Sequence, residues 1–76
     1  MFFIAKKDKK QILQILLEHD CRCKMNDLVK QYSYLNDKKT KRTKIREIIK
    51  VLNKELKKSV EVEIVEKQGL VEIRYY

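Results

Sequence analysis

Ten of the chain's 19 Lys and Arg residues lie in residues 38–58, where Glu47 and Glu55 are the acidic residues. This segment carries a net charge of +8, which equals the net charge of the whole 76-residue chain. Ammonium and guanidinium groups at this density favour anionic partners, above all the phosphates of nucleic acids. A charge run is also typical of a solvated helix face, so the segment alone leaves both interpretations open.

Arg42 and Arg46 are the strongest candidates for contacts that depend on base sequence. The chain has 15 Lys and four Arg, and two of the four Arg fall in the basic segment. The guanidinium fork of Arg donates two parallel hydrogen bonds to O6 and N7 of guanine, whereas Lys acts mainly as a point charge on phosphate. We therefore expect Arg42 or Arg46 to contact bases if the segment binds DNA, with chance placement as the competing explanation.

Other polar side chains are candidates for contacts to phosphates or base edges. Thr40, Thr43 and Lys50 suit either role, with helix capping as the alternative for the two threonines. Phosphate contacts are expected for a further set of lysines, namely Lys38, Lys39, Lys41, Lys44 and Lys54. Lys67 and Gln68 stand at a predicted turn, from which they would reach the DNA backbone or the minor groove.

A second group of reactive side chains consists of His19, Cys21 and Cys23. His and Cys are the usual zinc ligands, but the spacing is poor and the chain has no fourth His or Cys, so we expect packed thiols and no metal. A disulfide between such near neighbours closes almost no loop, which favours reduced thiols in a cytoplasmic protein. Nothing resembles a nucleophile with its base, so we expect no enzyme and no cofactor.

The size of the chain limits what can position these residues. A chain of 76 residues buries only about 60% of its unfolded surface, so we expect one domain over residues 1–76, too small for a deep enzymatic cleft or a small-molecule substrate. With 43% hydrophobic residues, 39% charged residues and no Pro, the chain should fold. No apolar run reaches the roughly 18 residues of a membrane helix, and we expect no membrane partner.

Apolar spacing predicts two helices in the first half of the chain. Residues 8–19 form an amphipathic helix whose inward positions are Ile12, Leu13, Leu16 and Leu17, with Ile15 beside them. A short extended segment over residues 21–24 follows. Asn26 is then expected to cap a second helix, of which the inward side chains are Leu28, Val29 and Tyr32.

The longest predicted helix follows a connection over residues 33–39 and contains most of the basic segment. Its apolar side chains fall in one narrow stripe, which consists of Ile45, Ile48, Ile49, Leu52 and Leu56. The opposite side carries most of the basic side chains, including Arg46, Lys50 and Lys54. One face of this helix is therefore predicted to be core and the other a basic ridge.

After Ser59 the apolar period changes from 3.6 to 2, which predicts two half-buried strands. Gln68-Gly69 lies between them, and Gly69 supplies the positive φ that a two-residue turn requires. This turn pairs Val62 with Tyr75, Ile64 with Ile73, and Glu63 with Arg74. The hairpin is acidic through Glu61, Glu63, Glu66 and Glu72, so its outer face is not expected to lie along DNA.

The predicted order of helix, extended segment, helix, basic helix and hairpin is that of a winged helix-turn-helix domain. We therefore predict an α+β fold, with three helices followed by a C-terminal β-hairpin wing, that binds double-stranded DNA with its third helix in the major groove. The alternative is a protein-binding module, such as a small phage inhibitor or adaptor that docks on an acidic protein surface. RNA is disfavoured because aromatic side chains are not interleaved with the basic run.

Residues 41–76 resemble the helix-turn-helix of the Mga and BglG-type bacterial regulators. In that family a recognition helix ends in an Ile-x-x-Leu-Asn-x-x-Leu pattern and continues into a hairpin with Gly at its turn. The matching residues are Ile49, Leu52, Asn53, Leu56 and Gly69. The departures are Ile48 in place of an acidic residue and Lys41 in place of a small N-cap. The resemblance implies a transcriptional regulator, and the absence of large regulatory domains implies a DNA-binding unit of the phage or mobile-element kind. A homodimer on paired half-sites is expected.

Overall fold

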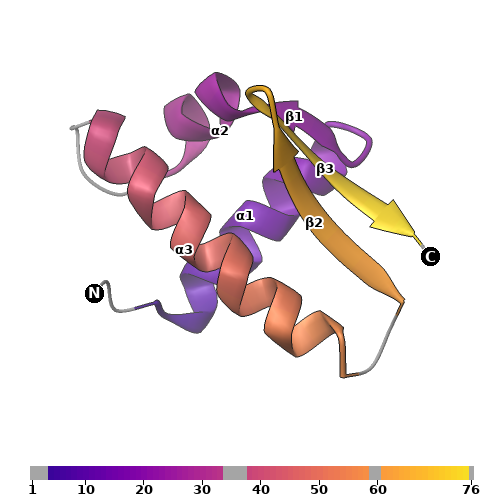
Figure 1. Cartoon of the computed structure of the whole chain (residues 1–76). Helices are drawn as coiled ribbons and strands as arrows, with labels where there is room; N and C mark the ends of the chain where they lie inside the picture. The colour runs from indigo at the N-terminus through magenta and orange to yellow at the C-terminus, as the bar shows by residue number, and fades with distance from the viewer. Residues whose placement is uncertain (1–3, 34–37, 59–60, 76) are drawn as a thin grey trace.

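The computed structural model describes residues 4–33, 38–58 and 61–75, and this part of the chain contains three helices and three strands (Figure 1). The elements are α1 (Lys6–Glu18), β1 (Arg22–Lys24), α2 (Met25–Gln31), α3 (Lys38–Leu56), β2 (Val62–Lys67) and β3 (Leu70–Tyr75). The strands form one antiparallel sheet in the order β1-β3-β2. The predicted α+β, winged-helix-like arrangement of three helices and a C-terminal hairpin is confirmed.

Helix α1 begins at Lys6, where Asp8 in its first turn accepts a hydrogen bond from the backbone N of Ala5 at 3.0 Å. Its buried apolar side chains are Ile12, Ile15 and Leu16. The prediction that Leu17 shares the inward face is wrong, because Leu17 is 61% exposed. The apolar residues between positions 12 and 17 occupy a wide arc of the helix surface. The neighbouring elements cover only part of this arc, and Leu17 lies outside the covered part.

Strand β1 runs directly into α2, which begins at Met25 and not after an N-cap at Asn26. The backbone N–H of Met25 donates to the carbonyl O of Gly69 at 2.8 Å, so the hairpin turn satisfies a helix-start donor that otherwise needs a capping group. Asn26 is exposed, and its side chain accepts a hydrogen bond from Arg42. The predicted inward side chains of α2 are confirmed as buried: Leu28, Val29 and Tyr32.

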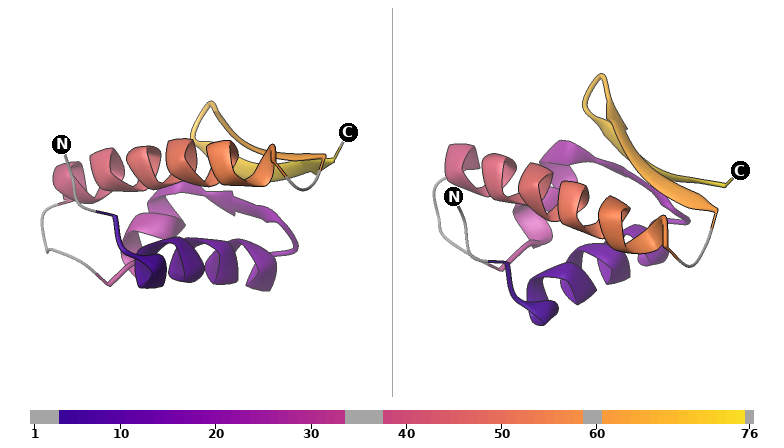
Figure 2. Two further views of the ribbon diagram at one scale, coloured as in Figure 1. Left: turned by 90° about the horizontal axis from the view of Figure 1, so that it is seen from below. Right: turned by 60° about the horizontal axis from the view of Figure 1, so that its bottom comes forward.

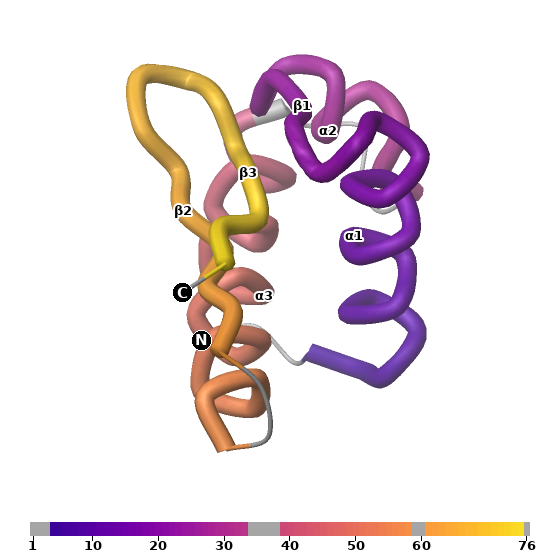
Figure 3. Tube along the Cα trace, turned by 90° about the vertical axis from the view of Figure 1, so that its right-hand side faces the viewer, coloured from indigo at the N-terminus to yellow at the C-terminus, as the bar shows by residue number. Residues whose placement is uncertain are grey.

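Helix α3 begins at Lys38, inside the stretch predicted as a connection, and spans 19 residues. The predicted apolar stripe is confirmed by the buried side chains of Ile45, Ile48, Ile49 and Leu52. Figures 2 and 3 show α3 between α1 and the hairpin. The stripe is part of the core, whereas Arg46, Lys50 and Lys54 on the opposite side of the helix are exposed. The side chain of Lys38, a predicted phosphate contact, lies outside the described part of the chain.

The hairpin has the predicted register, with Val62 opposite Tyr75, Glu63 opposite Arg74, and Ile64 opposite Ile73. At its turn, Gln68 and Gly69 have φ of +54° and +77°, the left-handed values that a type I′ turn requires at both positions. Strand β1 pairs with β3 so that Lys24 lies opposite Leu70. The hairpin therefore projects beyond β1 by little more than its two turn residues.

A buried polar cluster joins the three helices. The hydroxyl of Tyr32 donates to Oδ1 of Asp8 at 3.0 Å, and Nζ of Lys44 lies 3.7 Å from Oδ2 of Asp8. Burial raises the pKa of Asp8, but the hydrogen bonds from Ala5 and Tyr32 and the charge of Lys44 outweigh it and leave this pKa below its ordinary value. The cluster ties α3 to the start of α1 and the end of α2.

Candidate nucleic-acid interface

The solvent face of α3 carries a row of polar side chains along the whole helix. They follow one another at spacings of three or four residues, which places them on one line: Lys39, Thr43, Arg46, Lys50, Lys54 and Lys57. All six are exposed, and we call this row the basic ridge. The backbone N–H of Lys57 still donates to the carbonyl O of Asn53 at 3.1 Å, so the helical path extends to the last member. At 1.5 Å per residue the ridge is about 27 Å long.

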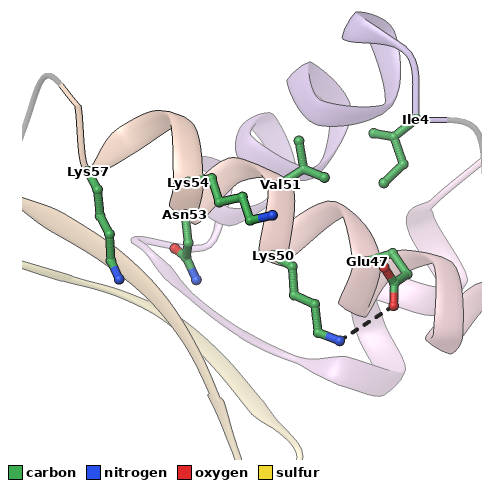
Figure 4. A pocket seen from close by; sticks show the side chains of 7 residues that line it. All are labelled: Ile4, Glu47, Lys50, Val51, Asn53, Lys54 and Lys57. Carbon is green, nitrogen blue, oxygen red and sulfur yellow. Dashed lines mark ion pairs between the residues drawn. The ribbon is translucent and has the colours of Figure 1, made fainter.

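A hollow of about 620 Å³ lies over the C-terminal half of this face (Figure 4). It is lined by Ile4, Glu47, Lys50, Val51, Asn53, Lys54 and Lys57. Lys50 pairs with Glu47 at 3.5 Å, one helical turn away. Figure 4 shows Ile4 and Val51 near the start of α1 and Lys57 near β2, so the hollow combines an apolar border with ammonium groups.

Arg46, in the middle of the ridge, is bound to the hairpin. Its Nε donates to Oε1 of Glu66 at 3.0 Å and its Nη2 donates to Oε2 at 3.3 Å. The Arg46 side chain is 53% exposed and that of Glu66 is 24% exposed. The hydrogen bonds and charge of Glu66 raise the pKa of Arg46 above its ordinary value. An ion pair this exposed contributes little to stability.

Arg42 and Lys41 lie beside the ridge, where α3 meets α2. Nη2 of Arg42 donates to Oδ1 of Asn26, and Nζ of Lys41 donates to the carbonyl O of Val29 at 3.4 Å. A hollow of about 270 Å³ at this junction is lined by Asn26, Val29, Lys30 and Arg42. Both cations are therefore directed toward α2 and away from the centre of the solvent face of α3.

The two threonines of the predicted site have different surroundings. Thr43 is exposed, and its Oγ1 donates to the carbonyl O of Lys39 at 3.1 Å, a bond that helical Thr commonly makes to the preceding turn. Thr40 is half-buried on the same helix. The hydroxyl of Thr43 thus lies on the ridge, whereas Thr40 lies to one side of it.

The prediction that Lys44 contacts phosphate is wrong. Its side chain is only 6% exposed and pairs with Asp8. On a helix, Lys44 stands 100° from Ile45, at the border of the apolar stripe, and the carboxylate of Asp8 provides a partner inside the protein. The remaining predicted lysines of α3 with described side chains are exposed or half-buried: Lys39, Lys41, Lys50 and Lys54.

The hairpin tip reaches the N-terminal half of α3. Lys67 and Gln68 are exposed at this tip. The hydrogen bond from the N–H of Met25 to the carbonyl O of Gly69 holds the turn against α2. A hollow of about 230 Å³ between the three elements is lined by Met25, Asn26, Arg42, Arg46, Glu66 and Gly69. The structure thus brings the hairpin tip and both arginines together, while Lys50 and Lys54 lie farther along α3.

Glu66 and Asn26 are members of this site that the sequence prediction missed. The predicted register could have placed Glu66 near α3, because Glu66 follows Ile64 by two residues and therefore lies on the inward face of β2. The prediction that Asn26 is an N-cap is wrong, because Asn26 is the second residue of α2. Both side chains supply an acceptor for an arginine of α3.

The candidate zinc ligands His19, Cys21 and Cys23 contact other groups of the protein. Nδ1 of His19 lies 2.8 Å from the carbonyl O of Ile15, and Nε2 lies 3.3 Å from the side-chain amide of Gln31. Cys21 and Cys23 are free thiols, and burial raises the pKa of Cys23. In the described ranges, no three His, Cys, Asp or Glu side chains gather as a metal site, and none of the helices is both long and apolar enough to cross a membrane.

Comparisons of the chain with protein-family models, with curated proteins and with solved structures gave no significant match.

Proposed function

We propose that this chain binds double-stranded DNA with the basic ridge of α3 in the major groove. The observation that carries the proposal is the coincidence of charge and position. The net charge of +8 resides in residues 38–58, and five exposed cations of that segment lie on the basic ridge, namely Lys39, Arg46, Lys50, Lys54 and Lys57. Winged helix-turn-helix proteins place the corresponding helix in the major groove, which is about 12 Å wide and admits an α-helix.

Within this proposal, the basic side chains divide into two roles. Phosphate contacts come from Lys39, Lys50 and Lys54 on the ridge, because lysine provides charge without base preference. Arg42 joins them, since its contact with Asn26 directs it to α2, the helix that crosses the DNA backbone in this fold. Arg46, at the centre of the ridge, is the candidate for a base contact.

The hairpin has a smaller role than a long wing would have. Its carboxylates Glu66 and Glu72 are paired with Arg46, Arg22 and Arg74, which reduces their repulsion of phosphate. Contact with DNA is limited to the exposed tip residues Lys67 and Gln68. A module of this size covers few base pairs, so we expect a dimer on paired half-sites, in the role of a small regulator that the resemblance to the Mga and BglG-type family implies.

The proposal is tested by the affinity for a random-sequence 20-base-pair duplex across a salt series. We expect the logarithm of the association constant to fall linearly with the logarithm of salt concentration, because each phosphate contact releases a counterion. Lys50→Ala and Lys54→Ala should each reduce the slope by about 0.9. Lys10→Ala, which removes an exposed charge from α1, should leave it unchanged. No measurable duplex affinity at low salt would overturn the proposal in favour of docking on an acidic protein surface.

A further inference from the structure

The ion pair between α3 and the hairpin occupies one edge of the Arg46 guanidinium and leaves the other edge open. Glu66 accepts hydrogen bonds from Nε and Nη2, which form the edge nearest the side-chain stem. A guanidinium has five N–H donors in one plane. Within the described residues, the Nη1 group and the second N–H of Nη2 donate to no other protein atom. One N–H of Nη1 and this second N–H of Nη2 are parallel and form the second bidentate edge.

We propose that Glu66 is a positioning residue that holds Arg46 to donate from this second edge to O6 and N7 of a guanine. The inference depends on the proposed function and adds a sequence preference to it. Arginine bound side by side to guanine is the commonest specific contact in the major groove, and it requires a fixed orientation of the planar fork. A long side chain that is already oriented loses less conformational freedom on binding.

The position of Glu66 suits this role. Glu66 lies opposite Val71, which is fully buried, and on the same face of β2 as the buried Ile64. The adjoining turn is held by the Met25–Gly69 hydrogen bond. The carboxylate therefore extends from an anchored part of the sheet. The Glu66 side chain is 24% exposed, whereas the Arg46 side chain is 53% exposed. Arg46 is therefore the more accessible member of the pair.

A competing role for Glu66 makes a different prediction. If the carboxylate merely masks the charge of Arg46, its removal should strengthen binding to every duplex by a similar factor. If it orients Arg46, its removal should reduce the preference for guanine without weakening binding to random DNA. The guanine preference of the Glu66 variant therefore shows whether Glu66 orients Arg46 or masks its charge. It also distinguishes both roles from a role of Glu66 in protein stability.

The test selects duplexes from a random 20-base-pair library and compares the chain with four variants. These are Arg46→Ala, Arg46→Lys, Glu66→Gln and, as a matched control on the outward face of β2, Glu63→Gln. We expect the unaltered chain to enrich one fixed guanine and to bind the selected duplex about 5- to 150-fold more tightly than its guanine-to-adenine counterpart. Arg46→Ala, Arg46→Lys and Glu66→Gln should each reduce that ratio, while Glu63→Gln retains it.

The outcomes distinguish this inference from the proposed function. Duplex binding with a guanine preference that survives Arg46→Ala or Glu66→Gln would overturn the inference and leave the proposed function intact. Stronger binding of Glu66→Gln to both duplexes at an unchanged ratio would also overturn it, in favour of masking. Failure of the unaltered chain to bind any duplex would overturn the proposed function itself. Unfolding midpoints of all variants verify that the substitutions leave the fold in place.

Discussion

The side-chain amide of Asn53 in α3 binds both backbone polar groups of Ile64 in β2. Its Nδ2 donates to the carbonyl O of Ile64 at 2.9 Å, and the N–H of Ile64 donates to Oδ1 at 2.7 Å. Strand β2 is at the edge of the sheet, where unpaired backbone groups invite pairing with another chain. Asn53 satisfies these groups in the middle of the strand and fixes the hairpin against the helix that carries the basic ridge.

Replacement of Asn53 by Ala should lower the free energy of unfolding by about 1 to 3 kcal/mol, because the polar groups of Ile64 lose their partner. Asn53→Asp should also destabilise the protein, since a carboxylate oxygen then faces the carbonyl of Ile64. Urea denaturation measures both effects. Lys54→Ala, the adjoining exposed position, is the control and should change stability by less than about 0.5 kcal/mol. Equal stability of Asn53→Ala and Lys54→Ala would contradict this account of the edge strand.

Leu16 and Leu17 form a matched pair that tests the orientation of α1. Leu16 is fully buried and Leu17 is 61% exposed. Leu16→Ala should therefore cost about 2 to 5 kcal/mol of unfolding free energy, whereas Leu17→Ala should cost less than about 0.5 kcal/mol. Thermal or urea unfolding of the two variants checks the difference. Comparable losses at both positions would mean that Leu17 is covered in solution.

The hairpin turn should tolerate Asn at position 69 better than Val. Gly69 has a φ of +77°, and no atom lies within 4 Å of an added Cβ, so a substitution there reports backbone conformation without a clash. Left-handed φ costs a non-glycine residue about 1 to 2 kcal/mol, least for Asn and most for β-branched side chains. The free energy of unfolding should be highest for the unaltered chain, lower for Gly69→Asn and lowest for Gly69→Val. Identical stabilities of the two variants would be evidence against the type I′ turn.

Acid should weaken the fold through Asp8. Because the pKa of Asp8 lies below its ordinary value in the folded protein, the unfolded chain binds the proton more readily. The stabilisation from the ionised carboxylate is therefore complete above the unfolded pKa of about 3.9 and is lost as pH falls through the lower folded value.

Asp8→Asn should remove this pH dependence and lower the free energy of unfolding near pH 7 by about 3 kcal/mol, since it also removes the negative charge that faces buried Lys44. Urea denaturation of both proteins between pH 7 and pH 2.5 provides the comparison. The two curves should converge as pH falls. Curves that stay parallel over this range would show that Asp8 does not contribute in this way.

The features that local sequence patterns predicted are those that local physics determines. The hairpin register followed from a period of 2 and from Gln68-Gly69, because the turn and the alternation of side chains fix which residues pair. The stripe of α3 followed from the 3.6 period around Ile45 and Leu52. Both the hairpin register and the stripe of α3 depend on residues that are close to one another in the sequence.

The features that the sequence prediction missed depend on contacts between distant segments. Lys44 resembles its neighbours in the basic run, and its pairing with Asp8 joins two segments that are 36 residues apart in the sequence. Met25 starts α2 without a capping side chain because Gly69, 44 residues later, accepts its N–H. The contacts of Arg42 with Asn26 and of Arg46 with Glu66 likewise span three elements. The sequence therefore indicated which helix carries the charge, and the structure shows which cations reach its solvent face.

The most direct measurement of the central claim is an NMR titration of the ¹⁵N-labelled chain with a short duplex at low salt. If the basic ridge enters the major groove, the amide signals of Thr43, Arg46 and Lys50 should shift most, with smaller shifts at the hairpin tip and in α2. Amides on the exposed side of α1, such as Lys10 and Gln14, should remain unchanged. Shifts that concentrate on α1, or an absence of shifts at any duplex concentration, would contradict DNA binding through α3.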